Sequence, residues 1–399
     1  MQTGITPNLA PSLPIDMVDG LRVSVLVPTF NRANYIAECL DSLLAQTMPA
    51  LEIIVIDDGS EDGTAQLLKR YGDRIRYVRK ENGGKPTAVN LGLSLAQGDL
   101  IWIFDDDDVA LPLAIESRVR AIAAVPEAGF VYSSHCYGTD GTDGKIRSNR
   151  SQQLQHYSSE RLFFELMKGC FFSLNSALVR ATAYQVVGGF DTHLLSSEDY
   201  DMALRLASVF PVVNTAEPTF IVREHDGLRG ANAVRYSGDQ RGQVFRKFDQ
   251  RVGLKLRASL PLGDYLVPRQ KTINDQAKKR QAYLARMTVM ASKGCLQETV
   301  EDLQSALALC APHSKFTALE LETITQAVCT GYAADSIENE WQQFRKMLAT
   351  VPASRSGRAA LMGIARGLFR LAKGYPGGIS LRMSRLAHAI SVVFLALTK

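Results

Sequence analysis

Hydrophobic and polar positions alternate in blocks along the first hundred residues. Short apolar runs typical of buried strands occur at residues 23–27, 53–56 and 100–104, and a further strand is predicted near residues 75–78. Between them, apolar side chains recur at helical spacing in residues 34–46, 64–71 and 87–96. Strands alternating with helices of this length predict an α/β fold built from βαβ units, with a mainly parallel sheet. The polar residues that end each strand should meet at one edge of that sheet.

The pattern loosens after residue 109. Helices are predicted at residues 115–125 and 200–209, strands at 129–133 and 171–179, and a Gly/Asp/Ser-rich loop at 137–151. From about residue 270 the pattern is helical. We expect an N-terminal extension over residues 1–21, an α/β domain over 22–264, a helical domain over 265–350 and a tail over 351–399.

Four consecutive carboxylates follow the strand predicted at residues 100–104. They are Asp105, Asp106, Asp107 and Asp108. Such a cluster repels itself unless a positive group lies in it. Mg²⁺ and Mn²⁺ bind through one or two carboxylates while substrate phosphates complete the coordination shell. The alternative is an acidic turn after a strand, but four acids in a row favour a metal and diphosphate site.

The charge of the chain is unevenly distributed. Of 399 residues, 46% are hydrophobic and 22% charged, which is ordinary for a globular protein. The whole chain has 45 Lys/Arg and 41 Asp/Glu, and residues 341–399 hold ten of the Lys/Arg and none of the Asp/Glu. The first 340 residues therefore hold 35 basic and 41 acidic residues, a net charge of −6. The basicity belongs to the tail, and an acidic body would handle a phosphorylated ligand through a metal. We expect no nucleic-acid partner.

Cysteine spacing and hydropathy indicate a cytoplasmic protein. The six cysteines include no CxxC pair and are expected to be reduced thiols. No Lys or Arg precedes Arg22, so we expect no secretory signal. The longest apolar stretch, residues 387–397, is shorter than the ~20 residues that a membrane-spanning helix needs.

Five motifs occur in a fixed order along residues 22–225, and together they resemble the family 2 glycosyltransferases of GT-A fold. The motifs lie at residues 24–32 (SVLVPTFNR), 54–60 (IVIDDGS), 82–92 (NGGKPTAVNLG), 105–108 (DDDD) and 188–201 (GGFD followed by EDYD). The resemblance implies inverting transfer of a sugar from a nucleotide-diphospho-sugar, usually uridine-based, to an acceptor hydroxyl of a glycan, lipid-linked glycan or surface polysaccharide. It also implies a divalent metal, Mn²⁺ or Mg²⁺.

The resemblance assigns a set of residues to the nucleotide-sugar donor. They are Pro28, Thr29, Phe30, Arg32, Asp58, Lys85, Asn90, Asp105, Asp106 and His225. Phe30 could stack on the base or simply pack the sheet edge, and Asp58 could accept the N3–H of uracil or serve a turn and helix cap. Lys85 could meet a phosphate or ribose, or lie solvated in its loop. His225 could lie near the phosphates or be structural.

The metal and the general base are likewise implied by the resemblance. Asp107 is the expected direct metal ligand, with Asp105 beside it, although four acids leave the register ambiguous by one residue. Asp199, next to Glu198, matches the base that takes the proton of the acceptor hydroxyl. The alternative for both acids is a favourable interaction with the dipole of a helix that begins there.

Residues 355–373 form two faces on a helical wheel. The cationic face holds Arg355, Arg358, Arg366, Arg370 and Lys373, and the opposite face holds Leu361, Ile364, Leu368 and Leu371. A helix of this kind can lie on anionic lipid, which predicts peripheral attachment to the cytoplasmic face of the membrane, with residues 379–397 adding apolar surface. The alternative is a core helix with a solvated face.

Two rival functions remain open. The chain could be a catalytically silent sugar-nucleotide or glycan-binding scaffold whose helical region recruits partners. It could also be a nucleotidyltransferase, which shares carboxylates at strand ends and a metal but releases diphosphate.

Overall fold

The computed structural model describes residues 20–225, 240–311, 315–374 and 379–399. Among these, contacts divide the chain into two compact units. The sheet unit holds the residues up to 159 together with 172–225, and the helical unit holds 160–171 together with 240–399. The division falls earlier than residue 264, because the helix at residues 241–259 packs with the helical unit.

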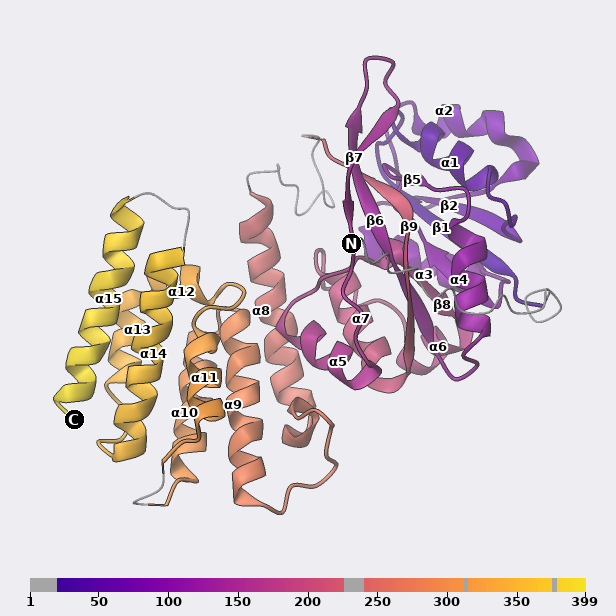
Figure 1. Ribbon diagram of the computed structural model, residues 1–399. Helices are drawn as coiled ribbons and strands as arrows, with labels where there is room; N and C mark the ends of the chain where they lie inside the picture. The colour runs from indigo at the N-terminus through magenta and orange to yellow at the C-terminus, as the bar shows by residue number, and fades with distance from the viewer. Residues whose placement is uncertain (1–19, 226–239, 312–314, 375–378) are drawn as a thin grey trace, which may run out of the picture. The chain divides into compact units, whose positions relative to one another are not determined.

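The sheet unit is built on nine strands in the order β3-β2-β1-β4-β8-β6-β9-β5, with β7 paired to β6 (Figure 1). Their bounds are β1 Val23–Thr29, β2 Glu52–Asp57, β3 Arg76–Arg79, β4 Leu100–Ile103, β5 Val109–Ala110, β6 Phe130–Asp140, β7 Ile146–Gln152, β8 Ala177–Arg180 and β9 Val212–Arg223. Strands β1 to β4 are parallel, as the alternating pattern predicted. Antiparallel pairs enter at β8, which makes the whole sheet mixed.

Helices cover both faces of the sheet, which explains why its first strands are apolar throughout. These helices are α1 Ile36–Leu44, α2 Thr64–Leu68, α3 Lys85–Leu95, α4 Ala114–Ala123, α6 Ala181–Val187 and α7 Glu198–Val209. All seven residues of β1 are buried, as expected for a parallel strand covered on both sides. Helices α1 and α4 share one core with Val25 and Trp102, while α3 packs on the other face, where Gly92 lies against Leu26. The α/β fold class is confirmed.

Residues 137–151 form a hairpin, not the loop that their composition predicted. Strand β7 pairs with β6 in antiparallel register from His135↔Gln152 to Asp140↔Ile146. Strand β7 is exposed along nearly all its length and carries no apolar alternation, so the strand signal is missing from its sequence. Pairing with β6 decides its conformation.

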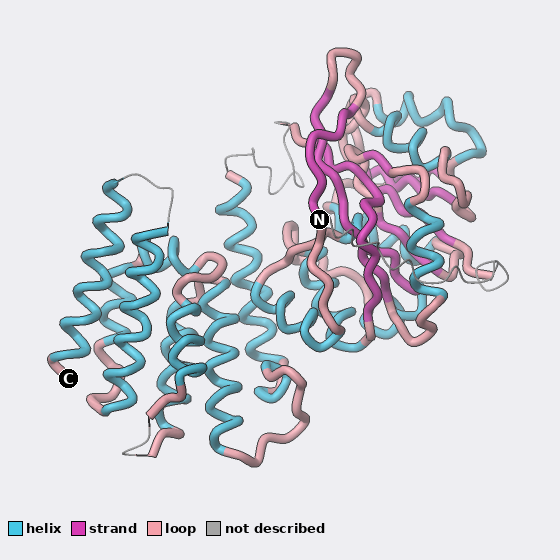
Figure 2. Tube along the Cα trace, in the orientation of Figure 1, coloured by secondary structure: helices cyan, strands magenta, loops and turns pink. Residues whose placement is uncertain are grey.

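The helical unit contains the second group of helices (Figure 2), of which the pattern after residue 270 predicted those from α9 onward. They are α5 Ser159–Lys168, α8 Arg241–Ser259, α9 Gln276–Ser292, α10 Leu296–Ala308, α11 Ala318–Ala327, α12 Ala333–Asn339, α13 Trp341–Leu348, α14 Arg355–Gly374 and α15 Ile379–Leu397. One apolar core, which includes Leu284, Leu303 and Ile324, joins α9, α10 and α11 to α14 and α15.

Helix α14 is not a separate tail. Leu361, Ile364 and Leu368, the apolar face expected to meet lipid, are buried in the core of the helical unit. Leu371 packs against that core. The prediction of membrane contact through this face is therefore wrong, and the alternative of a core helix with a solvated cationic face describes α14.

None of the helices in the described residues is both long and apolar enough to cross a membrane. The six cysteines, all within described residues, form no disulfide.

Candidate active site

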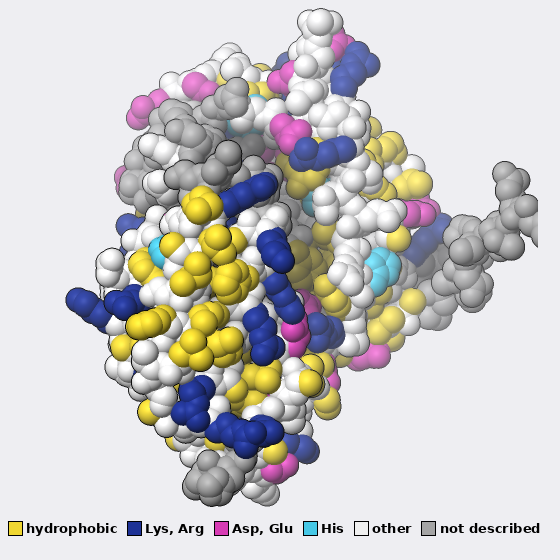
Figure 3. Space-filling view, turned by 60° about the vertical axis from the view of Figure 1, so that its left-hand side comes forward, with side chains coloured by type: hydrophobic (Ala, Val, Ile, Leu, Met, Phe, Trp, Pro, Cys, Tyr) yellow, Lys and Arg dark blue, Asp and Glu magenta, His cyan; other side chains and the backbone are white. Residues whose placement is uncertain are grey.

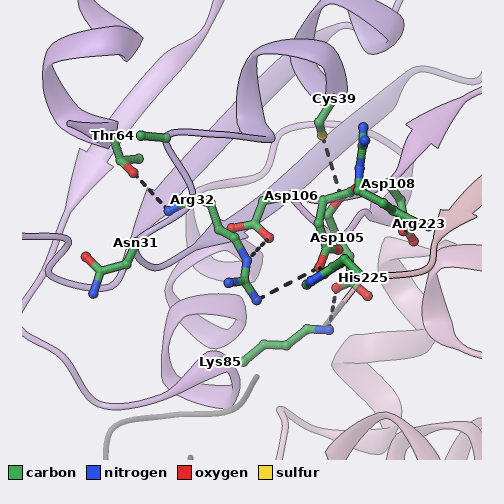
Figure 4. A network of polar contacts seen from close by, with 12 residues as sticks. Asn31, Arg32, Cys39, Thr64, Lys85, Asp105, Asp106, Asp108, Arg223 and His225 are labelled. Atoms are coloured by element: carbon green, nitrogen blue, oxygen red, sulfur yellow. Dashed lines mark hydrogen bonds and ion pairs between the residues drawn. The ribbon is translucent and has the colours of Figure 1, made fainter. Parts of the chain in front are cut away.

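The turns after β1 and β2 are joined by hydrogen bonds at the carboxyl ends of these parallel strands. Asn31 adopts the left-handed conformation, with φ 56°, and its side-chain oxygen accepts from the Glu61 amide at 2.8 Å. The Asn31 amide donates to Ser60 Oγ at 2.9 Å, and the Arg32 amide donates to Thr64 Oγ1 at 3.0 Å (Figure 4). These bonds hold the Arg32 side chain at the edge where the strand ends converge.

Asp58 holds the loop that precedes α3. Its carboxylate accepts from Lys80 Nζ at 2.5 Å, from Asn82 Nδ2 at 3.2 Å, and from the Gly83 and Gly84 amides at 3.0 and 2.7 Å. These donors occupy both carboxylate oxygens. Reading a base, the role implied by the resemblance, would require Asp58 to exchange one of these bonds.

The residues at the end of β1 that are expected to contact the nucleotide-sugar donor differ in their exposure to solvent. Pro28 and Thr29 are buried at the end of β1, where Thr29 pairs with Asp57 of β2 in the strand register, and Phe30 is half-buried beside them. Of these three, Phe30 is the side chain with surface left to offer a ligand.

Two of the protein's own cations pair with three members of the aspartate quartet. Lys85 Nζ, from the first residue of α3, lies 2.5 Å from Asp105 Oδ1. Arg32 reaches Asp106 Oδ1 at 3.4 Å and Asp107 Oδ2 at 3.9 Å. Figure 4 shows Arg32 and Lys85 both pointing toward the carboxylates. The positive partner demanded by four adjacent acids is therefore present in the chain.

Asp107 also meets His225, just beyond the end of β9. His225 Nε2 lies 3.0 Å from Asp107 Oδ2, and its ring packs on Tyr35 with centroids 4.9 Å apart. The sequence placed both residues in the site, and the structure brings them together from positions 118 residues apart.

Asp108 belongs to the scaffold. It accepts from the Arg223 amide at 2.9 Å and from Asn175 Nδ2 at 2.6 Å, and it is 4% exposed. Asn175 Oδ1 in turn accepts from the Asp105 amide at 3.1 Å. Asn175 thus ties the first and last members of the quartet, and it holds the Asp108 side chain in a buried position.

Arg223 encloses the quartet from the other side. Its buried guanidinium donates to the Asp107 carbonyl oxygen at 2.8 Å and makes ion pairs with Glu38, at 2.5 Å, and Asp140. Asn175 carried no signal in the sequence, because it lies in a segment predicted as an apolar strand. For Arg223 the only signal was its position two residues before His225.

Glu198 and Asp199 begin α7 and join the same cluster. Desolvation alone would lower the pKa of Lys85, but the carboxylates of Asp105, Glu198 and Asp199 outweigh it and raise that pKa. Glu198 is 8% exposed, and desolvation together with the charge of Asp199 raises its pKa to about 7. Two separate elements therefore present three acids to one lysine.

Asp106 has a similarly raised pKa. Desolvation and the charge of Asp107 bring it to about 7, against the opposing effect of Arg32. Asp106 is therefore a buried acid that is paired with Arg32.

Asn90 has a structural role different from the expected donor contact. Its side-chain nitrogen donates to the Phe190 carbonyl at 2.9 Å and its side-chain oxygen accepts from the Phe190 amide at 2.7 Å. A Cβ on Gly189 would come within 2.8 Å of that oxygen, so this close approach requires glycine. Asn90 thereby ties α3 to the segment that leads into α7.

The side chains of the site partly fit the coordination of a divalent metal. Within the described ranges, no group of three or more His, Cys, Asp or Glu side chains converges as a metal site. Asp107 and His225 offer one oxygen and one nitrogen within 3.0 Å of each other, and substrate phosphates commonly supply the remaining ligands of such ions.

The fold and site define a class. The first strands of the sheet are parallel, and carboxylates, a lysine and an arginine gather at their ends. Further acids join this edge from the start of a helix. This is the architecture of nucleotide-diphospho-sugar transferases.

Comparison with known proteins narrows this class. Residues 24–188 match the model of glycosyl transferase family 2. An uncharacterised glycosyltransferase of Rickettsia typhi is 32% identical over 212 residues, which cover 51% of this chain and 64% of that protein. Chondroitin synthase of Pasteurella multocida is 32% identical over 190 residues, 47% of this chain and 19% of that protein.

A solved structure extends the similarity in fold. The S. aureus TarS fragment 1–349 in complex with UDP-GlcNAc has a TM-score of 0.52 and 16% identity, covering 81% of this chain and 92% of the fragment. The sheet unit belongs to the family 2 glycosyltransferases and has the GT-A fold. The matched regions span at most 64% of the length of these two curated relatives.

Proposed function

We propose that this chain transfers a sugar from a nucleotide-diphospho-sugar, with a uridine-based donor, to an acceptor hydroxyl of a glycan, lipid-linked glycan or surface polysaccharide. The family of the sheet unit supports the reaction class. The UDP-GlcNAc bound to TarS supports the uridine-based donor, and the similarity to chondroitin synthase supports a glycan acceptor.

The observation that carries the proposal is the meeting of acids from two elements at Lys85. Asp105 follows β4, whereas Glu198 and Asp199 begin α7, and all three act on the same ammonium group. An acid turn or a helix dipole alone would explain each motif separately. Neither explains why the two motifs meet at one lysine. A sugar transferase needs such a meeting, because the charged groups that bind the diphosphate of the donor must lie next to the general base.

The residues can divide the chemistry between them. The Asp199 carboxylate takes the proton of the acceptor hydroxyl, and the acceptor oxygen bonds to the anomeric carbon. The bond from that carbon to the diphosphate oxygen breaks on the opposite face, which inverts the configuration and releases the nucleoside diphosphate. Lys85 and Arg32 are placed to stabilise the negative charge that develops on the leaving diphosphate. Glu198, whose pKa is raised to about 7 by desolvation and by the charge of Asp199, lies next to this proposed base.

Mn²⁺ or Mg²⁺ is proposed as the cofactor, held by Asp107 and His225 with Asp105 nearby. The ion would act as a Lewis acid toward the diphosphate. We expect chelation to abolish donor turnover, and Asp107→Asn and His225→Ala to raise the Mn²⁺ concentration needed for half-maximal turnover. Mn²⁺-dependent turnover that both variants leave unchanged would place the metal elsewhere.

Asp199→Asn tests the base and the proposed function together. Turnover of UDP-sugars, measured as UDP release with an acceptor mixture, should fall by about a hundredfold or more, because one general base typically contributes that much. The matched control is Asp201→Asn in the same helical turn, whose carboxylate pairs with Arg205 at 2.8 Å. It should lower the unfolding temperature while leaving kcat largely intact.

The products decide between the rivals. Release of a nucleoside diphosphate supports a glycosyltransferase, and release of inorganic diphosphate would show a nucleotidyltransferase. Donor binding without turnover in the unmodified chain would support the silent scaffold.

A further inference from the structure

The outer face of α15 is an exposed apolar surface. Met383, Ile390, Phe394 and Leu397 are 59%, 56%, 67% and 75% exposed, and Ala387 lies exposed between them. Alternating steps of four and three residues place all five on one side of the helix. The opposite side, with Ala389, Val392 and Ala396, is buried in the helical core. We call the five exposed residues the α15 stripe.

Cations border this stripe. Figure 3 shows hydrophobic side chains gathered on this face of the molecule, with Lys and Arg along their edge. Helix α14 packs against α15, and its long exposed side chains are Arg355, Arg358, Arg366, Arg370 and Lys373. Of these, Arg370 is paired with Glu322 at 2.6 Å. We call these five residues the α14 cations.

We propose that the α15 stripe and the α14 cations together dock on an anionic lipid surface, with α15 lying in the plane of the interface. Exposed apolar patches of this kind mark interaction sites in soluble proteins. A helix that buries its apolar side chains at the headgroup boundary, with cations beside it, gains both from removal of apolar area from water and from attraction to anionic lipid.

The charge pattern favours lipid over a second copy of the chain. Residues 341–399 hold ten Lys/Arg and no Asp/Glu. Two copies joined through α15 would bring their α14 cations together without acids from this segment to neutralise them, and like charges that meet at an interface are costly. An anionic surface supplies the missing negative charge. The proposal places the interaction in the helical unit and does not depend on the chemistry of the sheet unit.

Vesicle flotation of the full chain tests the proposal. The chain should float with vesicles of phosphatidylcholine that contain phosphatidylglycerol, and should stay behind with phosphatidylcholine alone. Because screening weakens attraction between exposed charges, added salt should reduce the bound fraction.

Two double variants separate the apolar and cationic contributions. Ile390→Glu/Phe394→Glu removes the apolar contact, and Arg366→Glu/Lys373→Glu reverses two cations. We expect each to lower the apparent affinity by about tenfold or more. The matched control is Val186→Glu on α6, a residue 65% exposed in the sheet unit, which should float like the unmodified chain.

Several outcomes would overturn the proposal. They are equal binding to neutral vesicles, binding that both double variants leave unchanged, and failure to bind any vesicle. A dimer in analytical ultracentrifugation that Ile390→Glu/Phe394→Glu dissociates, without vesicle binding, would instead identify a second copy as the occupant. Unchanged unfolding temperatures and unchanged UDP release in the variants show that folding and catalysis are not the cause.

Discussion

At the residue scale, four adjacent aspartates are compatible with folding because each of them has a compensating partner. Asp105 meets Lys85, Asp106 and Asp107 meet Arg32, and Asp108 is buried against Asn175. A negative cluster is costly to bury without such compensation. The quartet is therefore both a candidate ligand site and a part of the scaffold, divided residue by residue.

Asn175→Asp tests the scaffold part. The change replaces the amide donor to Asp108 with a second carboxylate in a buried position, so we expect a loss of about 2–4 kcal/mol in unfolding free energy. Desolvation and the charge of Asp107 already raise the pKa of Asp108, so the two carboxyl groups should share a proton at low pH. The loss should be smaller at pH 5 than at pH 8, in denaturant titrations at both values.

Asn214→Asp is the matched control, because Asn214 donates to the Tyr132 hydroxyl and not to a carboxylate. Its effect should be smaller and independent of pH. A pH-independent loss for Asn175→Asp would show that the contact with Asp108 does not control stability.

At the element scale, the site depends on how α3 and α7 are held. Lys85 begins α3, Glu198 and Asp199 begin α7, and Asn90 on α3 bonds the backbone of Phe190, 100 residues away. Both helices were predicted from periodicity. Their connection could not be, because an asparagine side chain carries no information on which distant backbone it will meet.

Asn90→Ala distinguishes positioning from nucleotide contact. Loss of two bonds to Phe190 should let the segment before α7 move, and kcat should fall by about tenfold, as expected for the loss of about 1–1.5 kcal/mol in the transition state. The Kd for UDP, measured by calorimetry, should stay unchanged. Ser94→Ala on the same helix, which removes only a local bond to Leu91, is the control. A weakened UDP Kd in Asn90→Ala would restore the donor contact that the resemblance implied.

At the scale of the whole molecule, the two units should respond oppositely to pH. In the sheet unit, the pKa of Glu198 is raised from 4.5 to about 7, so the folded state binds more protons and stability falls as pH rises between these values. In the helical unit, burial of Lys293 lowers its pKa from 10.5 to about 8. There the unfolded state binds more protons, so stability rises between about pH 8 and 10.5.

Two variants test whether Glu198 and Lys293 cause these changes of stability with pH. Glu198→Gln should stabilise the chain by up to about 3 kcal/mol at pH 8 and have little effect near pH 4.5. Lys293→Met should abolish the rise above pH 8 and leave the acid-side slope unchanged. Thermal unfolding across this pH range, with each variant compared with the unmodified chain, measures both. Slopes that neither variant alters would assign the titration to other groups.

The sequence by itself determined the elements and the chemistry that they carry. Continuous apolar runs predicted β1, β2 and β4, because burial on both faces leaves that signature, and their alternation with helical stripes predicted a parallel order. The acids at the end of a predicted strand made Asp105 and Asp107 candidates for the site, and the order of the motifs indicated the family and, through it, Asp199. These features are local, so they can be recognised without knowing which distant residues pack against them.

Only the tertiary structure decided which of those residues face the site and which hold it together. Pairing with β6 makes a polar segment into strand β7. The core of the helical unit buries the face of α14 that the helical wheel predicted to contact lipid. Asp108 became structural through Asn175, and the exposed apolar stripe proved to lie on α15. The deciding partner is the neighbouring hairpin strand for β7 and is distant in sequence for Asp108, and in both cases burial and hydrogen bonding depend on that partner more than on the residue itself.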